Sequence, residues 1–174
     1  MNNMDNIIKA HNTQILNSDA TKQIESTCNC RNKETCPLPQ KCTIENVVYQ
    51  AKVTSTNSTK FYIGLTSTTF KSRYDQHKSS FNSAKDKHNT ELSKHIWKLK
   101  DNNTPYQITW KILQQAQPYY PKTKRCNLCL SEKYHIITAD KSTTLNSRSE
   151  LISSCRHRRK FLLSQYKKRK KSHQ

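Results

Sequence analysis

Hydrophobic and polar residues alternate with a period of two over residues 46–54. One face of this stretch carries Val47, Tyr49, Ala51 and Val53. The alternation predicts a half-buried strand. After a polar turn at residues 55–59, residues 60–65 form a second β-prone stretch, so we expect two antiparallel strands joined as a hairpin.

Apolar residues recur at helical spacing further along the chain. Residues 67–83 and 91–100 predict two helices. Their apolar faces carry Phe70, Tyr74, His77 and Phe81 in the first helix, and Leu92, His95, Ile96 and Leu99 in the second. A further helix is expected over residues 127–137, and a basic helix over residues 149–170.

A third strand is expected between these helices. Pro105 ends the helical pattern, and residues 107–114 alternate Ile108, Trp110 and Ile112 with polar neighbours. The order β-β-α-α-β-α predicts an α+β fold, with a small three-stranded antiparallel sheet flanked by helices. The 174 residues are enough for one such domain and its tails.

Composition divides the chain into four segments. Residues 1–27 are polar and read as a tail or the remnant of an upstream region, and residues 28–45 are rich in cysteine and proline, which favours an irregular knuckle. We expect the compact domain over residues 46–148. Residues 149–174 are expected to form a basic helix or tail.

The charge narrows the class of partner. Lysine and arginine number 31 against 12 acidic residues, so the formal net charge is +19. Such a field attracts polyanions, which makes nucleic acid the leading partner, and a basic protein that binds nothing specific is the alternative. No stretch is apolar enough for a membrane span or a signal peptide, which predicts an intracellular protein with no membrane partner.

Seven cysteines in a chain without a secretion signal favour metal ligation or free thiols over disulfides. Thiolates that lie close together can hold Zn²⁺ tetrahedrally, and four cysteines crowd before the domain: Cys28, Cys30, Cys36 and Cys42. His88 and His95 are alternative ligands, although helix packing explains them as well. Cys126 and Cys129 form half of a second site, and Cys155 is expected as a free thiol.

The chain contains a single glycine, Gly64, which follows a tyrosine-bearing stretch at the end of the second expected strand. Glycine is required where the backbone takes a positive φ or where another group approaches closely. We therefore expect a close approach to the backbone at this position. An ordinary turn that ends the strand is the alternative.

Two three-residue motifs lie on the expected hairpin. Val47-Val48-Tyr49 and Tyr62-Ile63-Gly64 resemble the paired elements of the GIY-YIG nuclease superfamily, with valine in place of the first glycine. The downstream order resembles the family as well, because Arg73 and His77 occur on the next helix, Glu132 on a later helix and Asn146 after it. The resemblance covers about residues 46–147.

Longer strings resemble the endonuclease domain of Penelope-like retroelements, in which this domain follows a reverse transcriptase. They are Cys28-Asn29-Cys30, Cys36-Pro37-Leu38 and the runs 91–97, 126–129 and 148–158. We therefore expect DNA as the substrate. The RNA of a parent element and a second copy of the chain are further candidate partners.

The resemblance implies a metal-dependent endonuclease that nicks DNA by hydrolysis. Glu132 would bind Mg²⁺, and Arg73 would stabilise negative charge on the phosphate with its fork of donors. Tyr49 would orient or deprotonate the attacking water, with Tyr62 and His77 placing it.

Each of these assignments has a structural alternative. Asn146 would hydrogen-bond the local backbone or a metal-bound water. Tyr49 and Tyr62 would otherwise be cross-strand core aromatics, and His77 would complete the apolar face of its helix. Glu132 would otherwise be a solvated helix residue.

The last stretch of the chain supplies the candidate DNA-binding residues: Arg156, Arg158, Arg159, Lys160, Lys167, Lys168 and Arg169. It should follow the phosphate backbone with little sequence preference. It also fits a nuclear import signal or a solubilising tail. Two rival functions remain, a catalytically inactive basic nucleic-acid-binding module on the same fold and a zinc-dependent structural module.

Overall fold

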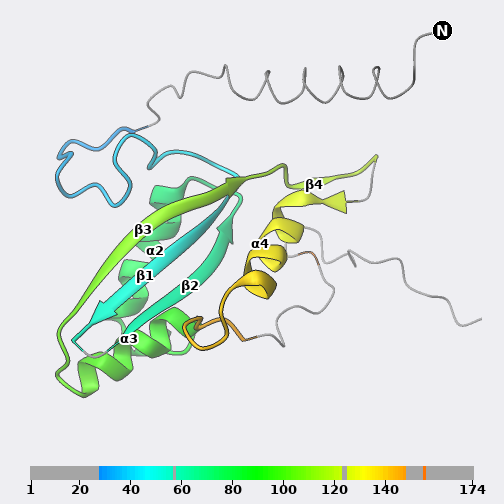
Figure 1. The fold of residues 1–174 in the computed structure, drawn as a ribbon. Coiled ribbons are helices and arrows are strands. Elements are labelled where there is room, and N and C mark those ends of the chain that lie inside the picture. The colour runs from blue at the N-terminus through cyan, green and yellow to red at the C-terminus, as the bar shows by residue number, and fades with distance from the viewer. Residues whose placement is uncertain (1–27, 57, 123–124, 148–154, 156–174) are drawn as a thin grey trace, which may run out of the picture.

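The computed structural model describes residues 28–56, 58–122, 125–147 and 155. Their elements are β1 (Val47–Ser55), β2 (Thr59–Thr66), α2 (Phe70–Asn82), η1 (Ala84–Asp86), α3 (Glu91–Asp101), β3 (Tyr106–Gln115), β4 (Tyr119–Tyr120), β5 (Arg125–Cys126) and α4 (Asn127–Thr138). The expected α+β class is confirmed, with a three-stranded antiparallel sheet and helices packed against it (Figure 1). The tail at 1–27, the basic helix at 149–170 and the DNA-binding candidates from 156 to 169 lie outside the described residues.

The sheet has the order β2-β1-β3, so the first strand of the hairpin lies in its centre. β1 pairs with β2 in a register that sets Tyr49 opposite Gly64, and with β3 in a register that sets Tyr49 opposite Ile112. A bulge interrupts the β1–β3 pairing between Val48 and Tyr49. The structure adds one small element to the expected order, the two-stranded hairpin of β4 and β5 before α4.

Helix α2 begins three residues later than the expected start at Ser67, because Thr69 caps it. The Thr69 hydroxyl accepts a hydrogen bond from the Ser72 backbone N–H at 3.3 Å. Two further N–H groups of the first turn, at Phe70 and Lys71, donate to backbone carbonyls of the preceding cysteine-rich segment. That segment therefore completes the start of α2.

Alternate residues of a strand point to opposite faces of the sheet, and the core accordingly forms two clusters. On one face Tyr49, Ala51 and Val53 pack with α2 and α3. On the other face Val48, Ile63 and Leu65 pack with α4. Three residues of the cysteine-rich segment belong to the first cluster, namely Cys36, Leu38 and Cys42, and Cys155 belongs to the second. Residues on both sides of the compositional boundaries at 45 and 148 thus pack into the same hydrophobic core clusters.

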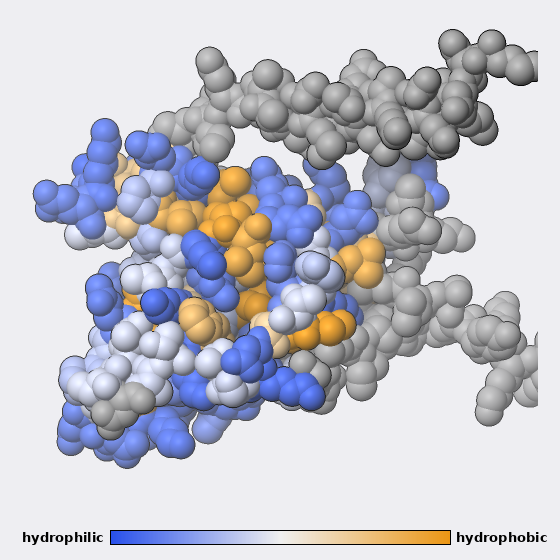
Figure 2. Space-filling view, viewed as in Figure 1, coloured by the Kyte–Doolittle hydropathy of each residue, from blue (hydrophilic) through white to orange (hydrophobic). Residues whose placement is uncertain are grey.

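The exterior of the described part is largely hydrophilic, in keeping with a mean hydropathy of -1.00. In the face shown in Figure 2, hydrophobic residues gather near the centre and hydrophilic residues surround them. None of the helices in this part of the chain has the length and apolar character that a membrane crossing requires.

Candidate functional site

Tyr49 lies in the central strand and is fully buried, and its hydroxyl is the meeting point of two side chains from α2. His77 Nε2 is 2.8 Å from the Tyr49 hydroxyl oxygen. Arg73 Nε donates a hydrogen bond to the same oxygen at 3.1 Å. Arg73 and His77 are four residues apart, so one helical face delivers both to the tyrosine.

Gly64 makes room for this tyrosine. A Cβ atom at position 64 would lie 2.5 Å from the Tyr49 hydroxyl oxygen and 2.7 Å from Tyr49 Cζ, and 3.1 Å from Tyr62 Cε1. The φ angle of Gly64 is not positive, so the close approach of the ring is what requires glycine. The expectation that Gly64 ends the strand was wrong, since β2 continues to Thr66.

Burial and the neighbouring guanidinium keep His77 neutral. Burial, followed by the positive charge of Arg73, lowers the pKa of His77 to about 3. For Arg73 itself, burial acts to lower the pKa, but the hydroxyls of Tyr49 and Tyr62 outweigh it and raise the pKa above its ordinary value. Arg73 therefore carries its charge beside the tyrosines at any physiological pH.

The donor and acceptor roles around Tyr49 follow from these charges. A guanidinium can only donate, so the Tyr49 oxygen accepts from Arg73. Neutral His77 can then accept the phenolic proton at Nε2, with its own proton on Nδ1. The Tyr49 hydroxyl therefore donates a hydrogen bond to His77 and accepts one from Arg73, whose charge stabilises negative charge on the Tyr49 oxygen.

Aromatic rings enclose this group, and one of them was not among the expected site residues. Trp110 on β3 lies 5.9 Å from the ring of Tyr49 and 5.5 Å from that of His77, between ring centroids. Tyr62 lies edge-on to His77 at 5.9 Å. The sequence carried a signal for Trp110, because it alternates with polar residues on the third expected strand, but only the β1–β3 register brings it to Tyr49.

A cleft of about 350 Å³ opens beside Arg73 and His77. Polar side chains from α2 and from the segment that leads to α3 complete its lining: Gln76, Ser79, Ser80, Asp86, Asn89 and Thr90. Gln76 accepts a hydrogen bond from Arg73 Nη1 at 2.8 Å, which holds the guanidinium at the cleft. The cleft therefore presents one positive group, the carboxylate of Asp86 and several neutral donors and acceptors to a polar ligand.

Glu132 lies on the other side of the sheet, and Asn146 lies at the outer edge of β2. Glu132 is only 4% exposed and shares the buried face of α4 with Leu128, Cys129 and Ile136, so it is not a solvated helix residue. Asn146 uses both amide atoms on Ile63 of β2, accepting from its N–H at 2.7 Å and donating to its C=O at 2.8 Å. The side-chain amide of Asn146 thus bonds the backbone of a strand 83 residues away in the sequence, and not the local backbone.

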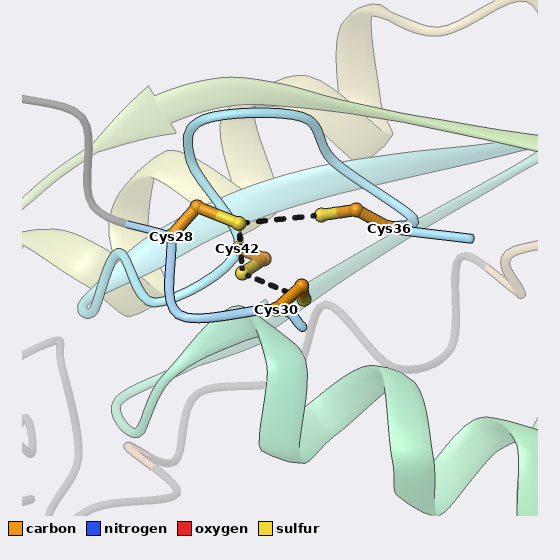
Figure 3. Close-up of side chains that lie close together, drawn as sticks. All are labelled: Cys28, Cys30, Cys36 and Cys42. Carbon is orange, nitrogen blue, oxygen red and sulfur yellow. Dashed lines mark hydrogen bonds between the residues drawn. The ribbon is translucent and has the colours of Figure 1, made fainter. Parts of the chain in front are cut away.

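The four cysteines before the domain come together in space. Their Sγ atoms all lie within 4.8 Å of one another. Figure 3 shows them converging from a looped segment beside the sheet, with Sγ–Sγ distances of 3.7 Å for Cys28–Cys36, 3.5 Å for Cys30–Cys42 and 3.2 Å for Cys28–Cys42. Thiolates on a tetrahedral Zn²⁺ with Zn–S bonds of about 2.3 Å are about 3.8 Å apart. The group could hold a metal such as zinc, and His88 and His95 do not belong to it.

The thiols of this group differ in how readily they ionise. A backbone hydrogen bond from Cys30, together with the thiol of Cys42, lowers the pKa of Cys28 to about 6. Burial and the neighbouring sulfurs raise the pKa of Cys42 to about 12. Without a cation the cluster therefore favours one thiolate, and a bound divalent metal would compensate the charge of the others.

Cys155 is a free thiol, as expected, but it lies close to two other cysteines. Its Sγ lies 3.7 Å from that of Cys129, and with Cys126 the two form a second group whose Sγ atoms lie within 4.8 Å of one another. None of the chain's described cysteines forms a disulfide. All seven cysteines therefore belong to one of two clusters that could hold a metal such as zinc.

Comparison with models of protein families, with curated proteins and with solved structures finds no match for this chain.

Proposed function

We propose that the protein is a metal-dependent DNA endonuclease that hydrolyses phosphodiester bonds and leaves a nick. The observation that carries the proposal is the Tyr49 hydroxyl held between Arg73 and neutral His77, beside a polar cleft. A base, a positive clamp and a solvent-accessible cavity are what hydrolysis of a phosphate ester needs. The formal net charge of +19 supports a polyanionic substrate.

Each residue of the site takes one part of the reaction in this proposal. Tyr49, as a phenolate stabilised by Arg73, orients the attacking water and takes up its proton, and neutral His77 holds the Tyr49 oxygen in place through Nε2. Arg73 faces the phosphate and stabilises the charge that develops on its oxygens, because a guanidinium offers several donors in a fixed plane. Tyr62 and Trp110 surround His77 and keep its ring in place.

The proposal assigns the catalytic metal, Mg²⁺, to Glu132. When bound, this ion supplies a Lewis acid that polarises a phosphoryl oxygen. A site with one carboxylate fits an ion that takes oxygen ligands and completes its shell with waters and substrate phosphates. Glu132 is only 4% exposed, and carboxylates are seldom fully buried unless they are paired, which fits a carboxylate held in one orientation. It lies on α4, across the sheet from α2, and does not line the cleft beside Arg73.

Nicking of supercoiled plasmid tests the proposal. The wild-type chain with Mg²⁺ should convert supercoiled to open-circular DNA, and EDTA should stop the conversion. Arg73→Ala should lower the rate at least about 100-fold, as expected when a transition-state charge clamp is lost. Tyr49→Phe removes only the hydroxyl and should have a comparable effect. Tyr134→Phe on the exposed face of α4 is the matched control and should nick at the wild-type rate.

Two further variants separate the roles of charge and metal. Arg73→Lys keeps the charge but loses the planar fork, so it should recover only part of the rate. Glu132→Gln should abolish nicking at any Mg²⁺ concentration if the carboxylate holds the ion. Should Glu132→Gln nick normally, Glu132 serves the fold and the metal assignment fails. Should the wild type bind DNA and never nick it, the chain is the inactive binding module.

A further inference from the structure

The second cysteine cluster is built around the start of α4. Cys126 is the last residue of β5 and the N-cap of the helix, and Cys129 lies in the first helical turn. Cys155 joins them from 26 residues further along the chain, and each of the three is at most 1% exposed. A Cys-x-x-Cys spacing at the start of a helix places both sulfurs on one side of the first turn, where a third ligand can complete a site.

The sulfur geometry fits a metal better than a disulfide. A disulfide requires an S–S distance of about 2.05 Å. The Cys129–Cys155 distance is 3.7 Å, which is the edge of a tetrahedron around Zn²⁺ with Zn–S bonds of about 2.3 Å. The same 3.7 Å separates Cys28 and Cys36 in the four-cysteine group.

The start of α4 also attracts negative charge. The N-terminus of a helix carries partial positive charge, and α4 has no acidic residue in its first turn and no side-chain cap. Buried thiols can serve as small apolar side chains, but that use does not require three sulfurs to converge.

We propose that Cys126, Cys129 and Cys155 bind a second Zn²⁺ as thiolates and that this site fastens the chain at residue 155 to the start of α4. Binding releases three thiol protons, and the three thiolates and Zn²⁺ leave one net negative charge at the helix N-terminus. The fourth place of the tetrahedron belongs to a water or to a ligand from outside the group. The site does not depend on the nuclease proposal.

The proposed zinc site would hold the residue that comes directly before the basic stretch. That stretch begins at Arg156, the residue after Cys155, and α4 is the helix that carries Glu132. Zinc at this place would tie Cys155, the residue before the stretch, to the helix that carries the proposed catalytic carboxylate. In this proposal the zinc site is structural, and it positions the start of the basic stretch for contact with a nucleic acid.

Zinc content of the full chain tests the proposal. After gel filtration with a weak chelator, the metal content is measured by elemental mass spectrometry. We expect about two zinc ions per wild-type chain, and about one in Cys129→Ser or in Cys28→Ser. Cys155→Val fills the space with an apolar side chain of similar size and should also fall to about one. Cys155→His replaces one zinc ligand by another and should retain about two.

Cobalt distinguishes the ligand sets. Co²⁺ loaded into Cys28→Ser should show the intense sulfur-to-metal charge-transfer absorption of a thiolate site, and the double variant Cys28→Ser/Cys129→Ser should lose it. About one zinc in the wild type, with no change in Cys129→Ser or Cys155→Val, would overturn the proposal. So would a denatured, unreduced wild-type chain lighter by the two hydrogens of a Cys129–Cys155 disulfide.

Discussion

At the scale of single residues, the site depends on one close approach and one neutral histidine. The ring of Tyr49 fits into the sheet only because position 64 has no side chain. His77 can accept a hydrogen bond from the Tyr49 hydroxyl only because burial and Arg73 keep it unprotonated. Each condition leads to a measurable effect on stability.

Gly64→Ala should destabilise the fold by about 1–3 kcal/mol, the usual cost of forcing a methyl group into a packed core. The added Cβ would lie 2.5 Å from the Tyr49 hydroxyl oxygen, so the tyrosine must move. Urea unfolding measures the cost. In a Tyr49→Leu background the two nearest atoms are gone, and the additional cost of Gly64→Ala should shrink. Equal costs in both backgrounds would mean that the tyrosine is not what requires glycine.

The stability of the protein should fall on acidification because of His77. Its pKa is lowered to about 3 by burial and by Arg73, so between about pH 6.5 and pH 3 the unfolded chain binds a proton here that the folded chain does not. The unfolded state is therefore favoured as the pH falls through this window. From about pH 7 to pH 5 the loss from this residue amounts to about 2 kcal/mol.

Urea unfolding of His77→Gln at both pH values measures this contribution. The variant should lose about 2 kcal/mol less than the wild type between the two conditions. His88→Gln, at an exposed histidine before α3, is the control and should follow the wild type. An unchanged pH dependence in His77→Gln would show that His77 is protonated in the folded state.

At the scale of elements, the cysteine-rich segment and α2 act as one unit. The carbonyls of Ile44 and Cys42 accept hydrogen bonds from Phe70 and Lys71, and Lys71 Nζ donates to Asn29 at 3.1 Å. Helix α2 carries both Arg73 and His77, so the position of the knuckle influences the position of the site. Residues 143–146 have a comparable role for β2, whose outer edge they cover through Phe61 and Ile63.

Removing zinc from the first cluster should loosen the start of α2. In Cys28→Ser, or in the wild type stripped with a strong chelator, we expect hydrogen exchange at the amides of Phe70 and Lys71 to become about tenfold faster or more. The centre of β1 should stay protected. Lys71→Ala, which loses the contact to Asn29 but no thiol, is the control and should keep its zinc. If hydrogen exchange at Phe70 stays unchanged after zinc loss, the metal site of the cysteine-rich segment does not stabilise the start of α2.

At the scale of the whole molecule, charge should dominate the association with DNA. The net charge is +19, and nine lysines and arginines lie between Arg156 and Lys171. Each phosphate that a basic side chain neutralises releases counterions, which contributes about -0.9 to the slope of log affinity against log salt concentration. Affinity should thus be steeply dependent on salt and nearly independent of base sequence.

Fluorescence anisotropy with a short duplex at several salt concentrations measures this slope. Replacing the five basic residues at 167–171 by glutamine should make the slope shallower by about 2–4 units if most of them contact phosphate. The double variant Lys94→Gln/Lys98→Gln on the exposed side of α3 is the control and should change the slope less. If the variant at 167–171 has the same salt dependence of DNA affinity as the wild type, other residues make the contacts to DNA.

The local pattern of the sequence was enough to predict most elements and the class of fold. The period of two identified β1 and β3, and the helical period identified α2 and α3, with bounds within about three residues of those found, because these periods record which face of each element is buried. Tyr49, Gly64, Arg73 and His77 were candidates because their order along the chain resembles that of a known family, and the structure brings these four together. It did not predict the hairpin of β4 and β5, whose strands are too short to produce a pattern.

Only the tertiary structure decided which of these residues meet. Trp110 reaches Tyr49 because β3 pairs with β1 rather than with β2, and Glu132 lies across the sheet because α4 packs on the second face. Cys155 meets Cys129 across 26 residues of chain, a contact that no local spacing encodes. The physical reason is common to all three. Local periodicity reports burial, whereas strand order and register are set by packing between segments that are distant in the sequence.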